Sequence, residues 1–186
     1  MAYEENFTDD RLKDALVAET IFNWVWLERL PHNGTISNKP LKGLFPPEND
    51  PWGWERCNYT PQSYQPAKPE TPCFVDWPRC ACKPSKKHPW QWDSFETPRF
   101  TTDVKDDHMA MEQVVTKFTP REVIEFQASV LQIWHDRSGL NSSNKMDGFV
   151  LYKPGDYSNA ALRMFQSFHP DHPAFTEKRV FRGKED

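Results

Sequence analysis

Proline is the feature that most constrains what this chain can fold into. Thirteen of the seventeen prolines lie between residues 31 and 98, a spacing that neither a helix nor a central strand is expected to tolerate. Each proline lacks a backbone N–H donor and pushes the preceding residue toward extended geometry. We therefore expect this segment to run as polyproline-like chain and turns rather than as regular secondary structure.

The same segment is rich in aromatic rings, which solvated linkers avoid. It holds five of the eight tryptophans, and each large ring can bury roughly 150 to 250 Å² against a partner. We expect the segment to lie on the surface of another molecule with its rings anchored in pockets. The residues predicted to contact this partner, two of them from the preceding segment, are Trp24, Trp26, Trp52, Trp54, Tyr59, Tyr64, Trp77, Trp90 and Trp92.

Residues 9–30 predict a single N-terminal helix, with Thr8 or Asp9 as its N-cap and an amphipathic pattern over its first half. From Ile21 onward the apolar side chains would point in every direction around such a helix. A core on one side cannot cover them all, so this end is expected to contact another body.

The strongest local helix signals begin at Thr119. Thr119 and Glu122 form a capping-box pattern, and Pro120 occupies the first helical position. Helical spacing then predicts one helix of about five turns that ends at Ser138. Its expected apolar stripe is Val123, Phe126, Val130, Ile133 and Trp134. The other elements predicted nearby are a weaker helix over 106–117, a short strand over 148–152 and a short helix over 158–168.

These patterns predict a mainly α protein with extensive irregular structure, two to three short helices and little sheet. The expected parts are an N-terminal helical arm over 1–30, an extended docking segment over 31–104 and a small helical region over 105–186.

Charge and hydropathy exclude several classes of partner. The formal net charge is −4 and the pI about 5.9, so there is no basic field to attract nucleic acid. The longest apolar run, residues 21–27, is far below the roughly 20 residues that span a bilayer. The acidic N-terminus lacks the features of a secretory signal, which predicts a cytoplasmic protein without a membrane span.

A zinc site is the main metal hypothesis, and its ligands would be Cys73, Cys80, Cys82 and His88, with Cys57 further away. Structural zinc sites usually take two close pairs of ligands from tight turns. Cys80 and Cys82 are only two residues apart, and prolines separate the other candidates. We therefore predict no metal and interpret the thiols as small packing residues.

The sequence contains no nucleophile elbow, phosphate-binding glycine loop, dinucleotide fingerprint or zinc-protease motif. The acidic cluster at Asp103, Asp106 and Asp107, next to His108, is interpreted as capping the start of a helix. We expect a protein without catalytic residues or cofactors.

The segment His169-Pro170-Asp171 follows a short apolar helix and resembles the end of helix II and the His-Pro-Asp loop of J-domains. That resemblance would imply stimulation of an Hsp70 chaperone. It covers about twenty residues, and the preceding helix has only Arg163 as a base. We interpret the segment as a turn between two prolines, with an incidental likeness to the J-domain loop.

In composition the chain resembles the inner and accessory proteins of ciliary doublet microtubules, which thread proline- and aromatic-rich segments between tubulin subunits. The resemblance rests on runs such as residues 50–54, 59–64 and 88–92. It implies a structural subunit of the ciliary axoneme with tubulin or other axonemal proteins as partners. A supernumerary subunit of a mitochondrial respiratory or ATP synthase complex, or a small zinc-stabilised adaptor, would account for the same composition.

Overall fold

The computed structural model describes six stretches of the chain, which are residues 10–29, 41–45, 64–66, 73–74, 97–138 and 152–177. The chain divides into two compact units. The first, here called the helical unit, comprises residues 1–22 and 98–176. The second, here called the strand unit, comprises residues 23–97 and 177–186. The N-terminal helix thus belongs with the helices of the C-terminal region.

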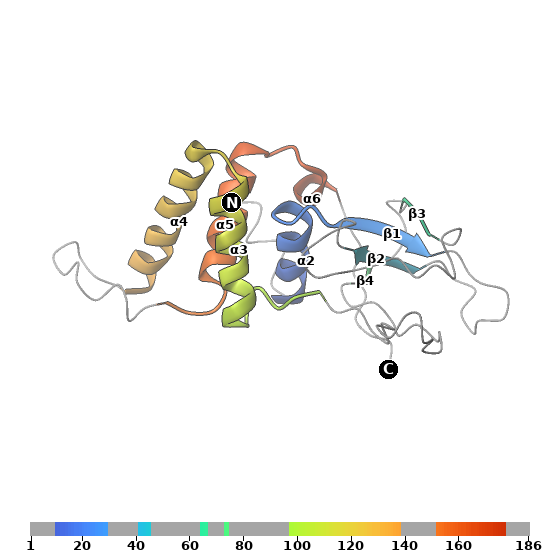
Figure 1. Ribbon diagram of the computed structural model, residues 1–186, viewed down its shortest axis with the longest axis horizontal. Coiled ribbons are helices and arrows are strands. Elements are labelled where there is room, and N and C mark those ends of the chain that lie inside the picture. The colour runs from blue at the N-terminus through green and yellow to red at the C-terminus, as the bar shows by residue number, and fades with distance from the viewer. Residues whose placement is uncertain are drawn as a thin grey trace. The chain divides into compact units, whose positions relative to one another are not determined.

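The described residues are mainly helical, as the sequence predicts, but they form more than two or three helices (Figure 1). The helical unit contains α2 (Asp10–Thr20), α3 (Val104–Lys117), α4 (Pro120–Ser138), α5 (Asp156–Phe168) and α6 (Pro173–Thr176). Helix α5 packs against α2, α3 and α4. Its buried residues include Ala160 and Ala161, whose small side chains let neighbouring helices approach closely.

The prediction of one helix over residues 9–30 is wrong beyond Thr20. Helix α2 ends there, Asn23 adopts a φ of 57° in the left-handed region, and the chain continues as strand β1 (Val25–Arg29). Aromatic and β-branched residues favour a strand. Apolar side chains that would surround a helix alternate between the two faces of a strand.

The strand unit contains a sheet of order β3-β1-β2-β4, whose other strands are β2 (Leu41–Phe45), β3 (Tyr64–Pro66) and β4 (Cys73–Phe74). Strand β1 pairs antiparallel with β2 and β3, and β2 pairs parallel with β4.

Strand β2 corrects the prediction that residues 31–98 hold no central strand. It fits between Pro40 and Pro46, where five consecutive residues are free of proline. Pro66 belongs to β3, which lies at an edge of the sheet, the place where strands accept proline. Apart from β4 and residues 97–98, the rest of the predicted polyproline-like chain lies outside the described residues.

Two predicted helices are confirmed with earlier starts. Helix α3 begins at Val104 because Asp103 caps it, accepting hydrogen bonds from the backbone N–H groups of Lys105 (2.8 Å) and Asp106 (3.2 Å). The helix predicted over 158–168 is α5, which begins at Asp156. Of the strand predicted over 148–152, only Tyr152 is described, and it is not part of a strand.

Helix α4 confirms both the predicted bounds and the predicted cap. The backbone N–H of Thr119 donates to the Glu122 carboxylate (2.8 Å), and the N–H of Glu122 donates to the Thr119 hydroxyl (3.4 Å). This reciprocal pair is a capping box. In the predicted apolar stripe, Phe126 and Val130 are buried and the other three residues are half-buried.

Replacement of Thr119 by alanine should lower the free energy of unfolding by about 1 kcal/mol, because the Glu122 N–H loses its acceptor at the start of α4. Urea unfolding of the full chain measures this loss. Thr116 is a matched control, since it is also exposed and its hydroxyl bonds to the Glu112 carbonyl within α3. Thr116→Ala should be nearly neutral. Equal effects of the two substitutions would contradict a capping role for Thr119.

No helix within the described ranges has both the length and the apolar content needed to cross a membrane.

Candidate functional site

The most elaborate polar cluster of the helical unit surrounds Asp107 on α3. One carboxylate oxygen accepts from the Ser158 backbone N–H (2.7 Å) and the Ser158 hydroxyl (2.6 Å). The other accepts from the Tyr152 hydroxyl (2.9 Å) and the Tyr157 N–H (3.3 Å). Helix α5 has Gly155 at its N-cap, which offers no side-chain acceptor. Asp107 therefore supplies the missing cap from a neighbouring helix.

Asp107 and Ser158 are fully buried, so neither group faces a substrate-accessible surface in this arrangement. Burial raises the pKa of Asp107, against the opposing effect of its hydrogen bonds from Ser158, Tyr152 and Tyr157. The Ser158 hydroxyl also lies 3.0 Å from the Phe100 carbonyl, so its one proton has two acceptors within reach. This corrects the prediction for Asp107, which caps α5 rather than its own helix.

A second buried carboxylate, Asp14 on α2, joins that helix to the turn before α3. It accepts from the backbone N–H and the hydroxyl of Thr101, both at 2.8 Å, and from Arg11 at 2.6 Å. Burial raises the pKa of Asp14, although the bonds from Thr101 and the charge of Arg11 act in the opposite direction. The arrangement orders the backbone at Thr101 and leaves no carboxylate oxygen exposed for chemistry.

The third carboxylate, Asp156, joins the end of α4 to the start of α5. Both terminal nitrogens of Arg137 donate to it, and further bonds come from Trp134 Nε1 (3.0 Å) and the Lys153 N–H (2.9 Å). Burial acts to raise the pKa of Asp156, but the bonds and charge of these donors outweigh it and the pKa is lowered. A bidentate Arg–carboxylate pair of this kind fixes geometry as well as charge.

The lowered pKa of Asp156 predicts a dependence of stability on pH. The ionised carboxylate binds its donors in the folded state, so its contribution is present above the ordinary value of 3.8 and is lost as pH falls through the folded pKa. Asp156→Asn should lower the free energy of unfolding by about 2 kcal/mol at pH 7. Below about pH 4, the free energy of unfolding should fall less for this variant than for the native chain. Urea unfolding at a series of pH values measures both effects.

Asp136→Asn is the control for this experiment, because Asp136 is 58% exposed at the same end of α4. Its replacement should change the free energy of unfolding by less than about 1 kcal/mol at pH 7. An Asp156→Asn profile parallel to the native one would contradict the role given to the ionised carboxylate.

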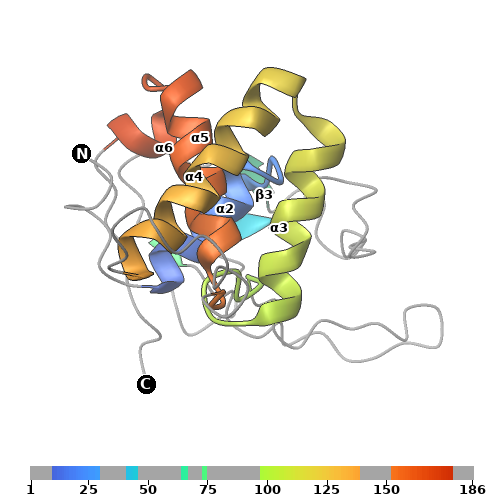
Figure 2. The same cartoon turned by 90° about the vertical axis from the view of Figure 1, so that its left-hand side faces the viewer.

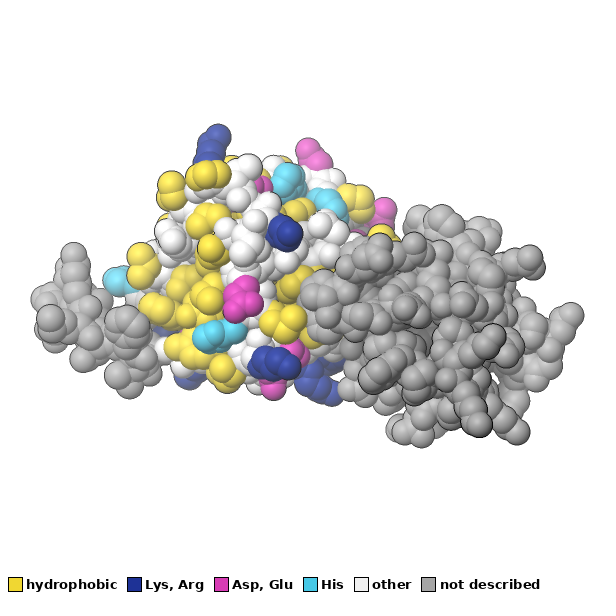
Figure 3. Space-filling view, viewed as in Figure 1, with side chains coloured by type: hydrophobic (Ala, Val, Ile, Leu, Met, Phe, Trp, Pro, Cys, Tyr) yellow, Lys and Arg dark blue, Asp and Glu magenta, His cyan; other side chains and the backbone are white. Residues whose placement is uncertain are grey.

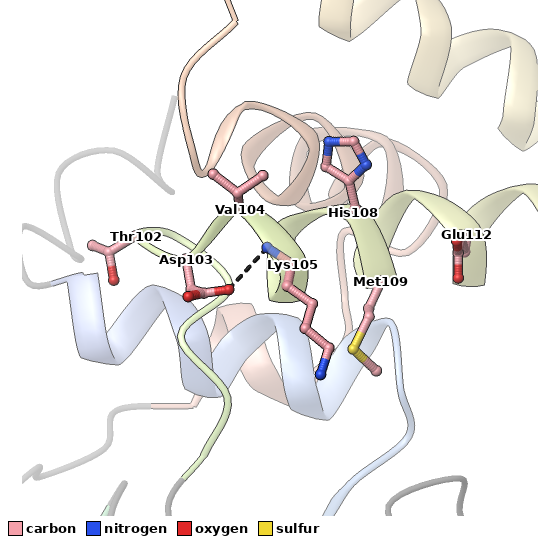
Figure 4. A pocket seen from close by; sticks show the side chains of 7 residues that line it. All are labelled: Thr102, Asp103, Val104, Lys105, His108, Met109 and Glu112. Atoms are coloured by element: carbon pink, nitrogen blue, oxygen red, sulfur yellow. Dashed lines mark hydrogen bonds between the residues drawn. The ribbon is translucent and has the colours of Figure 1, made fainter.

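A surface groove of about 700 Å³ runs along the first turns of α3. Its walls include Asp103, Lys105, His108, Met109 and Glu112. Figure 4 shows the Lys105 and Met109 side chains on one side of the helix and His108 on the other, so the polar groups do not converge. The His108 ring instead lies edge-on to Tyr152 and Tyr157, at 5.5 and 5.2 Å between ring centroids.

The outer face of α4 exposes two large apolar side chains among polar ones. Ile124 and Leu131 are 66% and 64% exposed, and Ala128 and His135 on the same face are exposed as well. We call these four residues the α4 stripe. Figure 2 shows α4 in front of the other helices of its unit, and Figure 3 shows hydrophobic side chains gathered over α3 and α4.

The structure places few of the residues predicted to bind a partner or a metal. Trp24 is only 2% exposed, which corrects its prediction as a surface anchor, and Trp26 is half-buried in β1. Tyr64 lies in β3 and Cys73 in β4. The candidates that lie outside the described residues are Trp52, Trp54, Cys57, Tyr59, Trp77, Cys80, Cys82, His88, Trp90 and Trp92. Within the described ranges, no group of three or more His, Cys, Asp or Glu residues could hold a metal ion.

The predicted turn at residues 169–171 is confirmed between α5 and α6. The His172 backbone N–H donates to the His169 carbonyl (3.1 Å). His169 lies with its Nε2 3.6 Å from Glu122 Oε1 and its ring 4.5 Å from the Phe165 ring. These contacts tie the turn to the capping box at the start of α4.

Sequence reasoning missed the structural importance of Asp14 and Asp156 and misassigned that of Asp107. A signal was present in the helical pattern. Asp14 occupies the same face as Val17 and Ile21, and Asp107 occupies the same face as Ala110 and Val114. A carboxylate three and seven residues before buried apolar positions faces the core, where it needs hydrogen-bond donors from another element.

Comparison of the chain with family models, with curated proteins and with solved structures gives no significant match.

Proposed function

We propose that this protein is a non-enzymatic structural subunit that docks its proline- and aromatic-rich segment onto a larger assembly. The best candidate is the ciliary doublet microtubule, where the protein would act as an inner protein that stabilises the axoneme. Its partners would then be tubulin or other axonemal proteins.

One observation supports this proposal above all. Five of the eight tryptophans lie in the proline-rich segment over residues 31–98, and the buried Trp24 is not one of them. Large aromatic rings dominate the energetics of protein interfaces, and an extended backbone stiffened by proline loses little entropy when it docks. The polar clusters of the helical unit are consistent with this proposal, because their buried carboxylates connect helices to one another.

Cosedimentation of the full chain with assembled microtubules tests the proposal. We expect the native chain to pellet with the polymer and the double variant Trp52→Ala/Trp54→Ala to bind at least about tenfold more weakly, since buried tryptophans are frequent interface hot spots. The far-UV circular dichroism of the variant should keep the helical signal. Val104→Ala/Val115→Ala is the control, because these residues are 51% and 54% exposed on α3.

Two results would contradict the proposal. The native chain could fail to bind microtubules, or it could copurify with subunits of a respiratory or ATP synthase complex, which would support a supernumerary mitochondrial subunit. One equivalent of zinc that is lost in Cys73→Ser and Cys80→Ser variants would instead contradict the prediction of no metal. It would support a zinc-stabilised adaptor, because structural zinc contributes directly to folding.

A further inference from the structure

Helix α4 exposes large apolar side chains on the face opposite to the one that packs in its unit. Its inner face packs in the helical unit through Phe126 and Val130, which are 3% and 7% exposed. Its outer face is the α4 stripe, with Ile124 and Leu131 at 66% and 64% exposure. The nine residues from 126 to 134 include no charged side chain. An exposed helical face in water normally carries charged or strongly polar residues.

The spacing of the α4 stripe matches the seam of a two-helix coiled coil. Its members follow one another at intervals of four, three and four residues, the alternation that repeats every 3.5 residues along a heptad seam. The stripe is flanked by exposed Gln127 and Gln132, which carry no charge, and the exposed Glu125 lies beside its first two members.

We propose that α4 pairs in antiparallel orientation with α4 of a second copy of this chain. A two-fold axis between positions 127 and 128 would place Ile124 of each copy against Leu131 of the other. The two Ala128 side chains would lie next to the axis, where small residues allow the helices to approach. The stripe is thus complementary to itself, as a two-fold symmetric interface requires.

Charge selects the antiparallel orientation. Arg121 is exposed beside the first turn of the stripe, and Asp136 is 58% exposed at its last turn. An antiparallel pair brings Arg121 of each copy next to Asp136 of the other, whereas a parallel pair would set like charges together. The opposed helix dipoles favour the same orientation. This complementarity favours a second copy as the partner over an unrelated surface.

The interface is small, because one pair of helices of 19 residues extends over only about 28 Å. We expect a dimer that dissociates at roughly 10 to 100 µM, which is the range of a small, transient interface. This inference does not depend on the proposed docking of the aromatic segment.

Sedimentation equilibrium of the full chain over a range of concentrations tests the pairing. We expect a reversible monomer–dimer equilibrium, and at least about tenfold weaker association for Ile124→Glu and Leu131→Glu, which place charge in the seam. Both side chains are exposed, so the monomer should keep its circular dichroism and melting temperature. Val115→Glu is the matched control, because Val115 is 54% exposed on α3 outside the stripe.

Disulfide crosslinking tests the orientation, with the four native cysteines replaced by serine. A mixture of Ile124→Cys and Leu131→Cys chains should form the mixed dimer, while either chain alone should crosslink at least about tenfold more slowly, because disulfides need Cα atoms within roughly 7 Å. Faster crosslinking of each chain with itself would overturn the antiparallel arrangement.

Two other outcomes would overturn the inference as a whole. One is a native chain that stays monomeric at all concentrations. If a different protein then copurifies with the native chain and not with the α4 variants, that protein occupies the stripe. The other is a dimer that is equally sensitive to Val115→Glu and to the α4 substitutions.

Discussion

Replacement of Asp107 by alanine should lower the free energy of unfolding by about 3 to 5 kcal/mol, since it leaves several buried donors without an acceptor. The donors are the Tyr152 hydroxyl and the Tyr157 and Ser158 N–H groups, while the Ser158 hydroxyl keeps the Phe100 carbonyl as an acceptor at 3.0 Å. Two of these are backbone groups at the start of α5, which has no cap of its own. Urea unfolding at pH 7 with circular dichroism detection measures the loss.

Asp106→Ala is the matched control, because Asp106 is the neighbouring carboxylate on α3 and accepts one exposed bond from the Arg99 N–H (2.8 Å). Asp106 is half-buried, but it accepts only this one side-chain bond from another element, so its replacement should lower the free energy of unfolding by less than about 1 kcal/mol. Asp107→Asn should also destabilise, since each carboxylate oxygen accepts from two donors and either amide orientation turns an NH₂ group toward a pair of them. An Asp107→Ala loss no larger than that of Asp106→Ala would show that α5 does not need this cap.

Gly155→Ala is expected to cost about 2 to 4 kcal/mol, because two independent effects oppose a side chain at this position. The φ of Gly155 is +93°, a region that residues with a Cβ rarely adopt. A Cβ would also lie 2.6 Å from the Thr101 carbonyl oxygen and 3.1 Å from the Thr101 Cα. The neighbouring atoms are backbone and cannot move aside by rotating a side chain.

Thermal and urea unfolding of Gly155→Ala and of Pro154→Ala compare the two neighbouring positions. Pro154 is exposed, so its replacement should change the free energy of unfolding by less than about 1 kcal/mol. A Gly155→Ala chain as stable as the native one would mean that the loop before α5 can move away from Thr101 without lowering the free energy of unfolding.

The Asp107 cluster and Gly155 both lie against the backbone of residues 100 and 101. The Thr101 N–H donates to Asp14 of α2, and the Thr101 backbone lies where a side chain at Gly155 would be. The adjacent Phe100 carbonyl accepts from the Ser158 hydroxyl of α5. The Phe100 ring stacks on Phe22 at 4.9 Å between centroids. Residues 100 and 101 therefore join α2 to α5, although α2 is separated from them by about 80 residues of sequence.

Local signals in the sequence were sufficient for helix α4, which carries its own capping box. Helix α4 has the bounds and the capping box predicted from Thr119, Pro120 and Glu122. Such signals act over a single turn, so they do not depend on the rest of the fold. The apolar periodicity of α4 likewise identified Phe126 and Val130 as core residues.

The strand at Val25 was decided by pairing rather than by propensity alone. Residues 21–27 are apolar enough for either a helix or a strand, and a short apolar run does not distinguish the two. Antiparallel partners from β2 and β3, which lie far along the chain, satisfy the backbone of β1 as a strand.

The sequence by itself determined the mainly helical class, the start and end of α4 and the inner face of that helix. Only the tertiary structure decided that Asp107 caps α5, that Asp14 orders Thr101 and that Gly155 must lack a side chain. Each of these depends on contacts between residues that are distant in sequence, and a buried carboxylate is stable only where another element supplies its donors. Local propensity contains no information about which element that will be.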